Sequence, residues 1–68
     1  MSEYLGKTIR VSVADGRTLY GRLEAFTAEK DIIMCDSMEQ QPKDGSARFV
    51  GPVVVPGADV MKIGLQHL

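Results

Sequence analysis

The chain has 68 residues, enough for one small domain, and its single cysteine and single histidine exclude an internal disulfide and a His/Cys metal cluster. The chain has eight Lys and Arg and nine Asp and Glu. This near-neutral balance weakens the interpretation of the chain as a free-standing nucleic-acid binder, although a ring of copies can still focus positive charge. No apolar run approaches a membrane span and residues 1–7 lack the order of a secretory signal, so we expect a cytosolic protein without a membrane partner.

Alternation of apolar and polar residues with a period of two dominates the start of the chain. Ile9–Val13 alternate in this way, which predicts a half-buried strand. Asp15-Gly16-Arg17 then predicts a hairpin turn, because glycine accepts positive φ at no steric cost. A second strand is expected over residues 18–26, and Gly21 inside it predicts a sharp bend or a close backbone approach.

The rest of the chain reads as short strands separated by turns. We expect a turn at residues 27–30, a third strand over 31–39, a polar loop over 40–46, a fourth strand over 48–55, a break at Pro56-Gly57 and a fifth strand over 60–65. Pro52 interrupts the fourth strand and should face away from its neighbour or sit at a bulge. Only one helical turn fits before Gly6, so an N-terminal helix is minimal or absent.

Five short strands without a helix to cover a sheet face favour one solution. Strong curvature closes such a sheet on itself and buries its apolar face, as in SH3-like and OB-type barrels. The sequence therefore predicts an all-β fold, a strongly bent five-stranded barrel formed by residues 1–68 as a single domain. A core this small predicts a chain of marginal stability that gains stability from partners.

The groups that catalysis needs are absent or poorly placed. His67 lies one residue from the C-terminus, and Cys35 lies in an apolar strand, where we expect a buried, inert thiol. The carboxylates are spread along the chain and no pair stands out as an acid/base couple. We interpret Gly51-Pro52 and Pro56-Gly57 as residues that interrupt or end strands. They do not form a phosphate-binding loop, because such a glycine-rich loop would precede a helix. We therefore expect no catalytic residue, no cofactor and no metal.

Residues 6–23 resemble the first motif of the Sm and Sm-like family. That motif begins near a glycine, here Gly6, pairs an alternating strand with Asp15-Gly16-Arg17 and places a glycine, here Gly21, at the bend of the second strand. The resemblance continues to the C-terminus with a gap at the loop 40–46. It implies a highly bent five-stranded barrel whose fourth and fifth strands pair with neighbouring subunits.

Two departures from the RNA-binding members concern the nucleotide pocket. Those members carry Asp-x-x-Met-Asn where this chain has Thr27 and Asp31, and Arg-Gly where it has Pro56-Gly57. Asp31 cannot donate to a base carbonyl as an asparagine amide does, and its charge opposes phosphate. Pro56 has neither a cation nor an N–H. Because both halves of the pocket are altered together, we expect that nucleic acid is not the ligand.

One branch of the family shares the second motif of this chain. The pattern Gly-x-x-x-Val-Pro-Gly-x-x-Ile-x-x-Ile is similar to Gly51–Ile63, with Val55-Pro56-Gly57 as its discriminating stretch. The branch comprises the small Sm-like auxiliary subunits of N-terminal acetyltransferase C (NatC). It implies a cytosolic heterotrimer with a GNAT-fold catalytic subunit and a large scaffold subunit, in which this chain is structural and binds neither acetyl-CoA nor peptide as its main task.

The apolar residues of the last two strands are candidates for a protein interface. Neighbouring residues on a strand face opposite ways, so if Val53 and Val55 point inward, Val54 points outward and needs a partner. The full candidate set is Val53, Val54, Val55, Pro56, Val60, Met61 and Ile63, with Tyr4, Leu5 and Tyr20 as weaker candidates. Asp15-Gly16-Arg17 is either a partner contact or, as we favour, turn chemistry.

Three functions remain open at this point. The first is an auxiliary subunit of an acetyltransferase, and the second is an RNA-binding Sm-like ring subunit. The third is an assembly scaffold outside NatC, such as a ring component that serves RNA decay through protein contacts. Arg10, Arg22 and Lys62 are interpreted as a solvated rim, because acidic residues intersperse them. An enzyme acting alone ranks last.

Overall fold

Five antiparallel strands form one sheet in the computed structural model, which describes residues 2–66. The strands are β1 (Thr8–Val13), β2 (Thr18–Phe26), β3 (Ile32–Gln40), β4 (Ala47–Val55) and β5 (Val60–Leu65). Two short 3-10 turns, η1 (Ser2–Tyr4) and η2 (Gly57–Asp59), complete the described elements. The expected all-β fold and the minimal N-terminal helix are confirmed. His67 lies outside the described residues.

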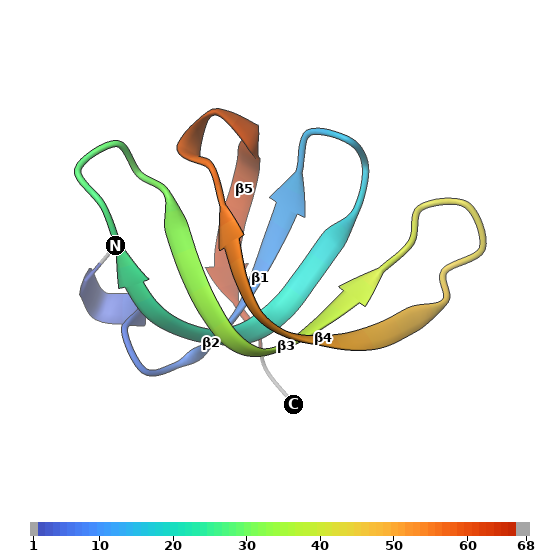
Figure 1. Ribbon diagram of the computed structural model, residues 1–68, viewed down its shortest axis with the longest axis horizontal. Coiled ribbons are helices and arrows are strands. Elements are labelled where there is room, and N and C mark those ends of the chain that lie inside the picture. Colours follow the sequence, from blue (N-terminus) through green and yellow to red (C-terminus); the bar gives the residue numbers. More distant parts are fainter. Residues whose placement is uncertain (1, 67–68) are drawn as a thin grey trace.

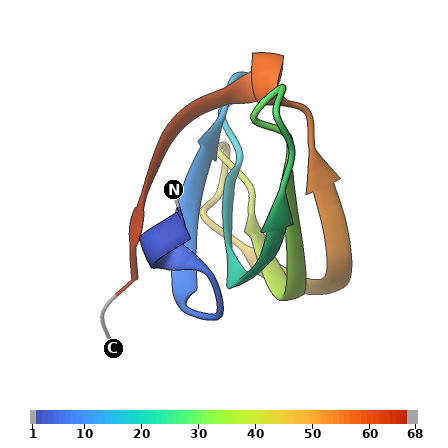
Figure 2. The same cartoon turned by 90° about the vertical axis from the view of Figure 1, so that its left-hand side faces the viewer.

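The sheet bends strongly but its hydrogen-bonded ladder has two open ends. The strand order is β4-β3-β2-β1-β5, so β4 and β5 are the edge strands. β2, β3 and β4 curve through their middles, and β5 follows β4 through η2 (Figure 1). Seen from the side, the sheet wraps around an interior (Figure 2). Within residues 2–66 the barrel is thus open between β4 and β5, and each of these strands has one unpaired side.

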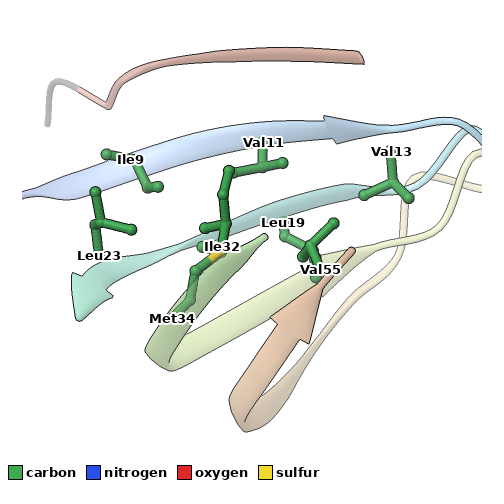
Figure 3. Close-up of a cluster of buried hydrophobic side chains, with 8 residues drawn as sticks. All are labelled: Ile9, Val11, Val13, Leu19, Leu23, Ile32, Met34 and Val55. Atoms are coloured by element: carbon green, nitrogen blue, oxygen red, sulfur yellow. The ribbon is translucent and has the colours of Figure 1, made fainter. Parts of the chain in front are cut away.

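The core occupies the inner face of the bent sheet, where alternate residues of the strands meet (Figure 3). Its buried side chains are at most 6% exposed and comprise Ile9, Val11, Val13, Leu19, Leu23, Ile32, Met34 and Val55. Tyr4, Val53, Val60 and Ile63 pack against this cluster while partly exposed. The alternation predicted for the fourth strand is confirmed, since Val55 points into the core and Val54 is 65% exposed.

Gly21 and Pro52 lie at irregularities in the strand register. A Cβ at Gly21 would lie 2.6 Å from Ser37 Oγ and 3.0 Å from the Cys35 carbonyl oxygen, which confirms the predicted close approach. Pro52 lies opposite a bulge, because the β3–β4 register passes from Met34–Val53 to Ser37–Gly51. The bulge contains Asp36, whose φ is 53°. The proline's missing N–H is therefore accommodated as expected.

The expectation of a buried Cys35 was wrong. Ile32 and Met34 take the inward positions of β3, so the alternation turns Cys35 to the outer face, where it is half-buried. Its thiol Sγ donates to Glu24 Oε2 at 3.1 Å. This hydrogen bond to a carboxylate raises the pKa of the Cys35 thiol. The residue is therefore more accessible than predicted, but its environment still disfavours a reactive thiolate.

Candidate nucleotide pocket and protein interface

The turn between β2 and β3 contains the altered position Thr27. Thr27 Oγ1 accepts a hydrogen bond from the Asp31 backbone N–H at 3.1 Å, and the Thr27 N–H donates to the Asp31 carbonyl at 3.1 Å. The Lys30 N–H donates to the Thr27 carbonyl at 2.9 Å, and Lys30 has a φ of 67°. Two hydrogen bonds between Thr27 and Asp31 thus join the first and last residues of this turn.

The Asp31 carboxylate connects this turn to the segment between β4 and β5. Its Oδ1 accepts a hydrogen bond from the backbone N–H of Gly57 at 2.7 Å, which we call the Asp31–Gly57 bridge. A Cβ at Gly57 would collide with the Glu29 carbonyl oxygen and lie 3.0 Å from the Lys30 carbonyl carbon. The backbone at Gly57 therefore lies directly against the turn. Glycine is required there because a side chain would have no room, and not because of an unusual backbone φ angle.

The segment Pro56–Asp59 is closed by further main-chain bonds. The Asp59 N–H donates to the Pro56 carbonyl at 2.9 Å, and the Asp59 carbonyl accepts from the Ala14 N–H at 2.8 Å. The structure thus brings together the three altered positions that the sequence singled out, Thr27, Asp31 and Pro56. Thr27 and Asp31 bond to each other, Asp31 bonds to Gly57, and the Pro56 carbonyl accepts from Asp59. None of the three altered residues has a cationic or amide side chain to offer a base.

The hairpin turn Asp15-Gly16-Arg17 belongs to an ion-pair network inside the chain. Asp15 accepts from the Arg17 backbone N–H at 3.0 Å and from Arg17 Nε at 2.6 Å, and Gly16 has a φ of 101°. Arg17 Nη1 also donates to Glu39 Oε2 at 2.6 Å. These contacts support the interpretation of this tripeptide as turn chemistry, with Arg17 engaged inside its own chain.

Glu39 is the buried acid of this network, and sequence reasoning missed it. It is 5% exposed, and besides Arg17 it pairs with Arg48, whose Nη2 lies 3.1 Å from Glu39 Oε1. The hydrogen bond from Arg17 holds the pKa of the Glu39 carboxyl below its ordinary value. The arrangement is one buried carboxylate between two guanidinium groups, so its charge is compensated and it has a structural role.

The predicted interface residues divide between the core and the surface. Val54 is 65% and Met61 71% exposed, and Pro56 is also exposed, so these three are available to a partner. Val55 is a core residue, whereas Val53, Val60 and Ile63 are half-buried against the core. Val54 and Met61 lie on β4 and β5, the two open edges of the sheet. The remaining motif glycines, Gly6 and Gly51, have φ angles of 77° and 72°.

Other kinds of site find little support in the described part of the chain. Residues 2–66 hold no group of three or more His, Cys, Asp and Glu that could bind a metal ion. No helix among them has the length and apolar character to cross a membrane.

Known proteins resemble this chain over nearly all of its length. The family described as "LSM domain" matches residues 1–65. The chain is 32% identical over 68 residues to the N-alpha-acetyltransferase 38, NatC auxiliary subunit, of Mus musculus, covering 93% of this chain and 54% of that protein. Overall, it spans between 27% and 55% of the curated relatives that it matches.

Solved structures of two kinds resemble the fold. A heptameric archaeal Sm protein has a TM-score of 0.88 at 26% identity, over 97% of this chain and 94% of that one. A chain in the crystal structure of the NatC complex bound to CoA has a TM-score of 0.85 at 31% identity, over 96% of this chain and 82% of that one.

Proposed function

The chain belongs to the LSM domain family, and on that premise we propose that it is a non-catalytic auxiliary subunit of a NatC-type N-terminal acetyltransferase complex. In this role it binds a GNAT-fold catalytic subunit and a large scaffold subunit in a cytosolic heterotrimer. It stabilises their assembly and leaves acetyl transfer to the catalytic subunit. Binding of nucleic acid or of a membrane is not part of this role.

The observation that carries the proposal is the Asp31–Gly57 bridge. It uses the two segments at which RNA-binding members of the family would hold a base, and it satisfies their polar groups within the chain. A nucleotide there would meet a carboxylate and a proline in place of an amide and a guanidinium. A pocket closed in this way favours a member of the family that works through protein contacts.

The similarities point in the same direction. The 31% identity to a chain of the NatC complex bound to CoA extends over 96% of this sequence. The likeness to the mouse NatC auxiliary subunit covers 93% of it. Val55-Pro56-Gly57, the stretch that carries the resemblance to the NatC branch in the sequence, lies at the open side of the barrel between β4 and β5.

The open edges of β4 and β5 offer a way to hold partner chains. An edge strand presents unpaired main-chain N–H and C=O groups, to which a partner strand can add. Val54 and Met61 place exposed apolar surface beside these edges. In the proposed complex the partner subunits cover this surface, which adds stability to a barrel with a small core.

Recovery of the tagged full chain from its own cells tests the proposal. We expect a GNAT-fold protein and a large subunit in amounts comparable to the bait. As a matched control, the same purification is repeated with Val54 and Met61 replaced by lysine, which should reduce both proteins together. Recovery of Sm-like proteins alone would contradict the proposal.

A second candidate is an RNA-binding ring subunit, favoured by the TM-score of 0.88 to a heptameric archaeal Sm protein. This function requires salt-sensitive binding of a short uridine-rich strand by the assembled protein. Binding that weakens steeply between low and physiological salt would support the ring subunit. Absence of binding at low salt in the assembled state would reject it.

A further inference from the structure

One row of residues on the outer face crosses all five strands. In the strand register Arg10 of β1 is opposite Gly64 of β5 and Tyr20 of β2. Tyr20 is opposite Met38 of β3, and Met38 is opposite Phe49 of β4. Residues opposite one another share a face, and the neighbours of Arg10 and Tyr20 in sequence, Ile9, Val11 and Leu19, point into the core. We call Arg10, Tyr20, Met38 and Phe49 the outer-face row.

The apolar side chains of this row are exposed or partly exposed, and a groove lies beside them. Phe49 is 66% and Met38 36% exposed, and the Tyr20 hydroxyl donates to Gln40 Oε1 at 3.0 Å, which orients its ring. A groove of about 560 Å³ adjoins the middle of the row, where Tyr20 and Met38 line it. Its other lining residues include Thr8, Arg22, Asp36 and Ala47, and Asp36 is paired with Arg22. At the β5 end Gly64 leaves the surface open, since a Cβ there would meet nothing within 4 Å.

The charge of this face is positive at the end formed by β1 and β5. Arg10 and Lys62, which lies in the next row opposite Ser12, have no carboxylate within ion-pair distance among residues 2–66. Arg22, by contrast, is engaged by Asp36 at 3.3 Å and Glu24 at 4.0 Å. The face therefore combines an apolar stretch over β2–β4 with uncompensated positive charge beside it.

We propose that the outer-face row docks an amphipathic helix of a partner protein that carries an apolar stripe and carboxylates at one end of it. The carboxylates complement Arg10 and Lys62, and the stripe covers Tyr20, Met38 and Phe49. This surface lies on the sheet's outer face, so the inference goes beyond the proposed function, which uses the edges of β4 and β5. It would stand even if the partners at those edges were different.

The backbone of the sheet favours a helix over an extended segment. β1, β2 and β3 are paired on both sides, so an extended segment lying across the row would find no free main-chain groups. A helix satisfies its own main chain, and its rise of about 5.4 Å per turn is close to the spacing of about 4.8 Å between neighbouring strands. Side chains at positions i, i+4 and i+7 can therefore contact successive strands along the row.

A synthetic helical peptide with leucines at i, i+4, i+7 and i+11 and glutamates at one end is the probe. It is titrated into the ¹⁵N-labelled full chain while backbone amide shifts are followed. We expect the largest shifts at the outer-face row. Phe49→Ala should weaken binding by at least about tenfold, whereas Met61→Ala, which removes an equally exposed apolar side chain from an edge, should leave it unchanged.

Charge reversal at Arg10 distinguishes specific ion pairs with the peptide from attraction by the net charge of the chain. Arg10→Glu should weaken binding about fivefold, and a peptide with lysines in place of the glutamates should recover it. Lys43→Glu changes the net charge equally in the loop between β3 and β4, and should have no effect. Equal losses for Arg10→Glu and Lys43→Glu, or equal binding of a scrambled peptide, would overturn the proposal. So would shifts confined to the edge residues around Val54 and Met61, no binding at millimolar peptide, or stronger shifts of the same amides with a uridine hexamer.

Discussion

The carboxylate of Asp31 accepts a hydrogen bond from the backbone N–H of Gly57 at 2.7 Å, across 26 positions of sequence. This contact fastens the β2–β3 turn to the segment that joins β4 and β5. One end, Asp31, is a position at which this chain departs from the RNA-binding pattern, and the other, Gly57, directly follows a second such position, Pro56. The bridge therefore engages polar groups of both segments within the chain and joins them at the open side of the barrel.

Loss of the Asp31 acceptor should destabilise the chain. We expect Asp31→Ala to lower the free energy of unfolding by about 1–2 kcal/mol, because a charge-assisted hydrogen bond is lost and Gly57 N–H loses its partner. Asp31→Asn keeps an oxygen acceptor and should lose less than half of that. Urea unfolding of the full chain measures both variants, and equal midpoints for wild type and Asp31→Ala would contradict the role of the bridge.

A substitution that adds a side chain at Gly57 tests the same contact independently. Gly57→Ala would press a methyl group against the backbone at Glu29 and Lys30, so the two segments must separate. We expect a loss of about 1–3 kcal/mol in thermal or urea unfolding. Gly64→Ala is the matched control, since its Cβ would enter open space. Similar losses for the two glycines would show that the close approach at Gly57 is not what matters.

Glu39 should link stability to acid pH. Because the hydrogen bond from Arg17 lowers the folded-state pKa of Glu39, its contribution to stability is fully present above the unfolded pKa of about 4.3. That contribution is lost as the pH falls through the lowered folded pKa. Glu39→Gln should reduce the Tm by several degrees at pH 7, because Arg17 and Arg48 lose their common carboxylate, and the difference from wild type should shrink on acidification.

The control for this pH profile is Glu29→Gln, which neutralises an exposed carboxylate in the β2–β3 turn. Its Tm difference from wild type should be small, because Glu29 lies on the surface of the turn. Other carboxylates, such as Asp15 with its hydrogen bond from the Arg17 N–H, also have a lowered pKa, so the comparison uses differences from wild type. A Glu39→Gln deficit that stays constant from pH 7 to pH 3 would be incompatible with this linkage.

A charge added at the edge strands β4 and β5 should impair the binding of partner subunits but not the folding of the chain. Val54→Lys and Met61→Lys place an ammonium group on surfaces that are 65% and 71% exposed, so the folded chain should tolerate either substitution within about 0.5 kcal/mol. Capture of partner subunits should fall at least about tenfold, because the charge must be buried at the interface. Ala28→Lys adds the same charge on the β2–β3 turn and should leave capture intact. Loss of capture by Ala28→Lys to the same extent would remove the argument for the edges.

Local sequence signals predicted most of the fold because they act over a few residues. The strand from Thr18 to Phe26, the alternation at Val54 and Val55 and the close approach at Gly21 follow from period-two patterning and from the size of glycine. The family resemblance added the altered pair Asp31 and Pro56. It identified these positions but not the bond from Asp31 to Gly57, which exists only once the fold brings the two segments together.

The bulge in β3 explains what the sequence did not predict. Simple alternation from Met34 would turn Asp36 and Met38 inward, but the extra residue at Asp36 turns Ser37 and Glu39 inward instead. The buried ion-pair network of Glu39 was therefore missed. Cys35 was misplaced for a different reason, because an apolar run was interpreted as fully buried where alternation still applied.

The mass of the intact complex isolated through the tagged full chain tests the central claim most directly. Native mass spectrometry should find one copy of the 7.4 kDa chain with one catalytic and one large subunit, and no bound nucleic acid. Removal of either partner should lower the thermal midpoint of the chain. A ring built from several copies of Sm-like chains with RNA attached would contradict the account.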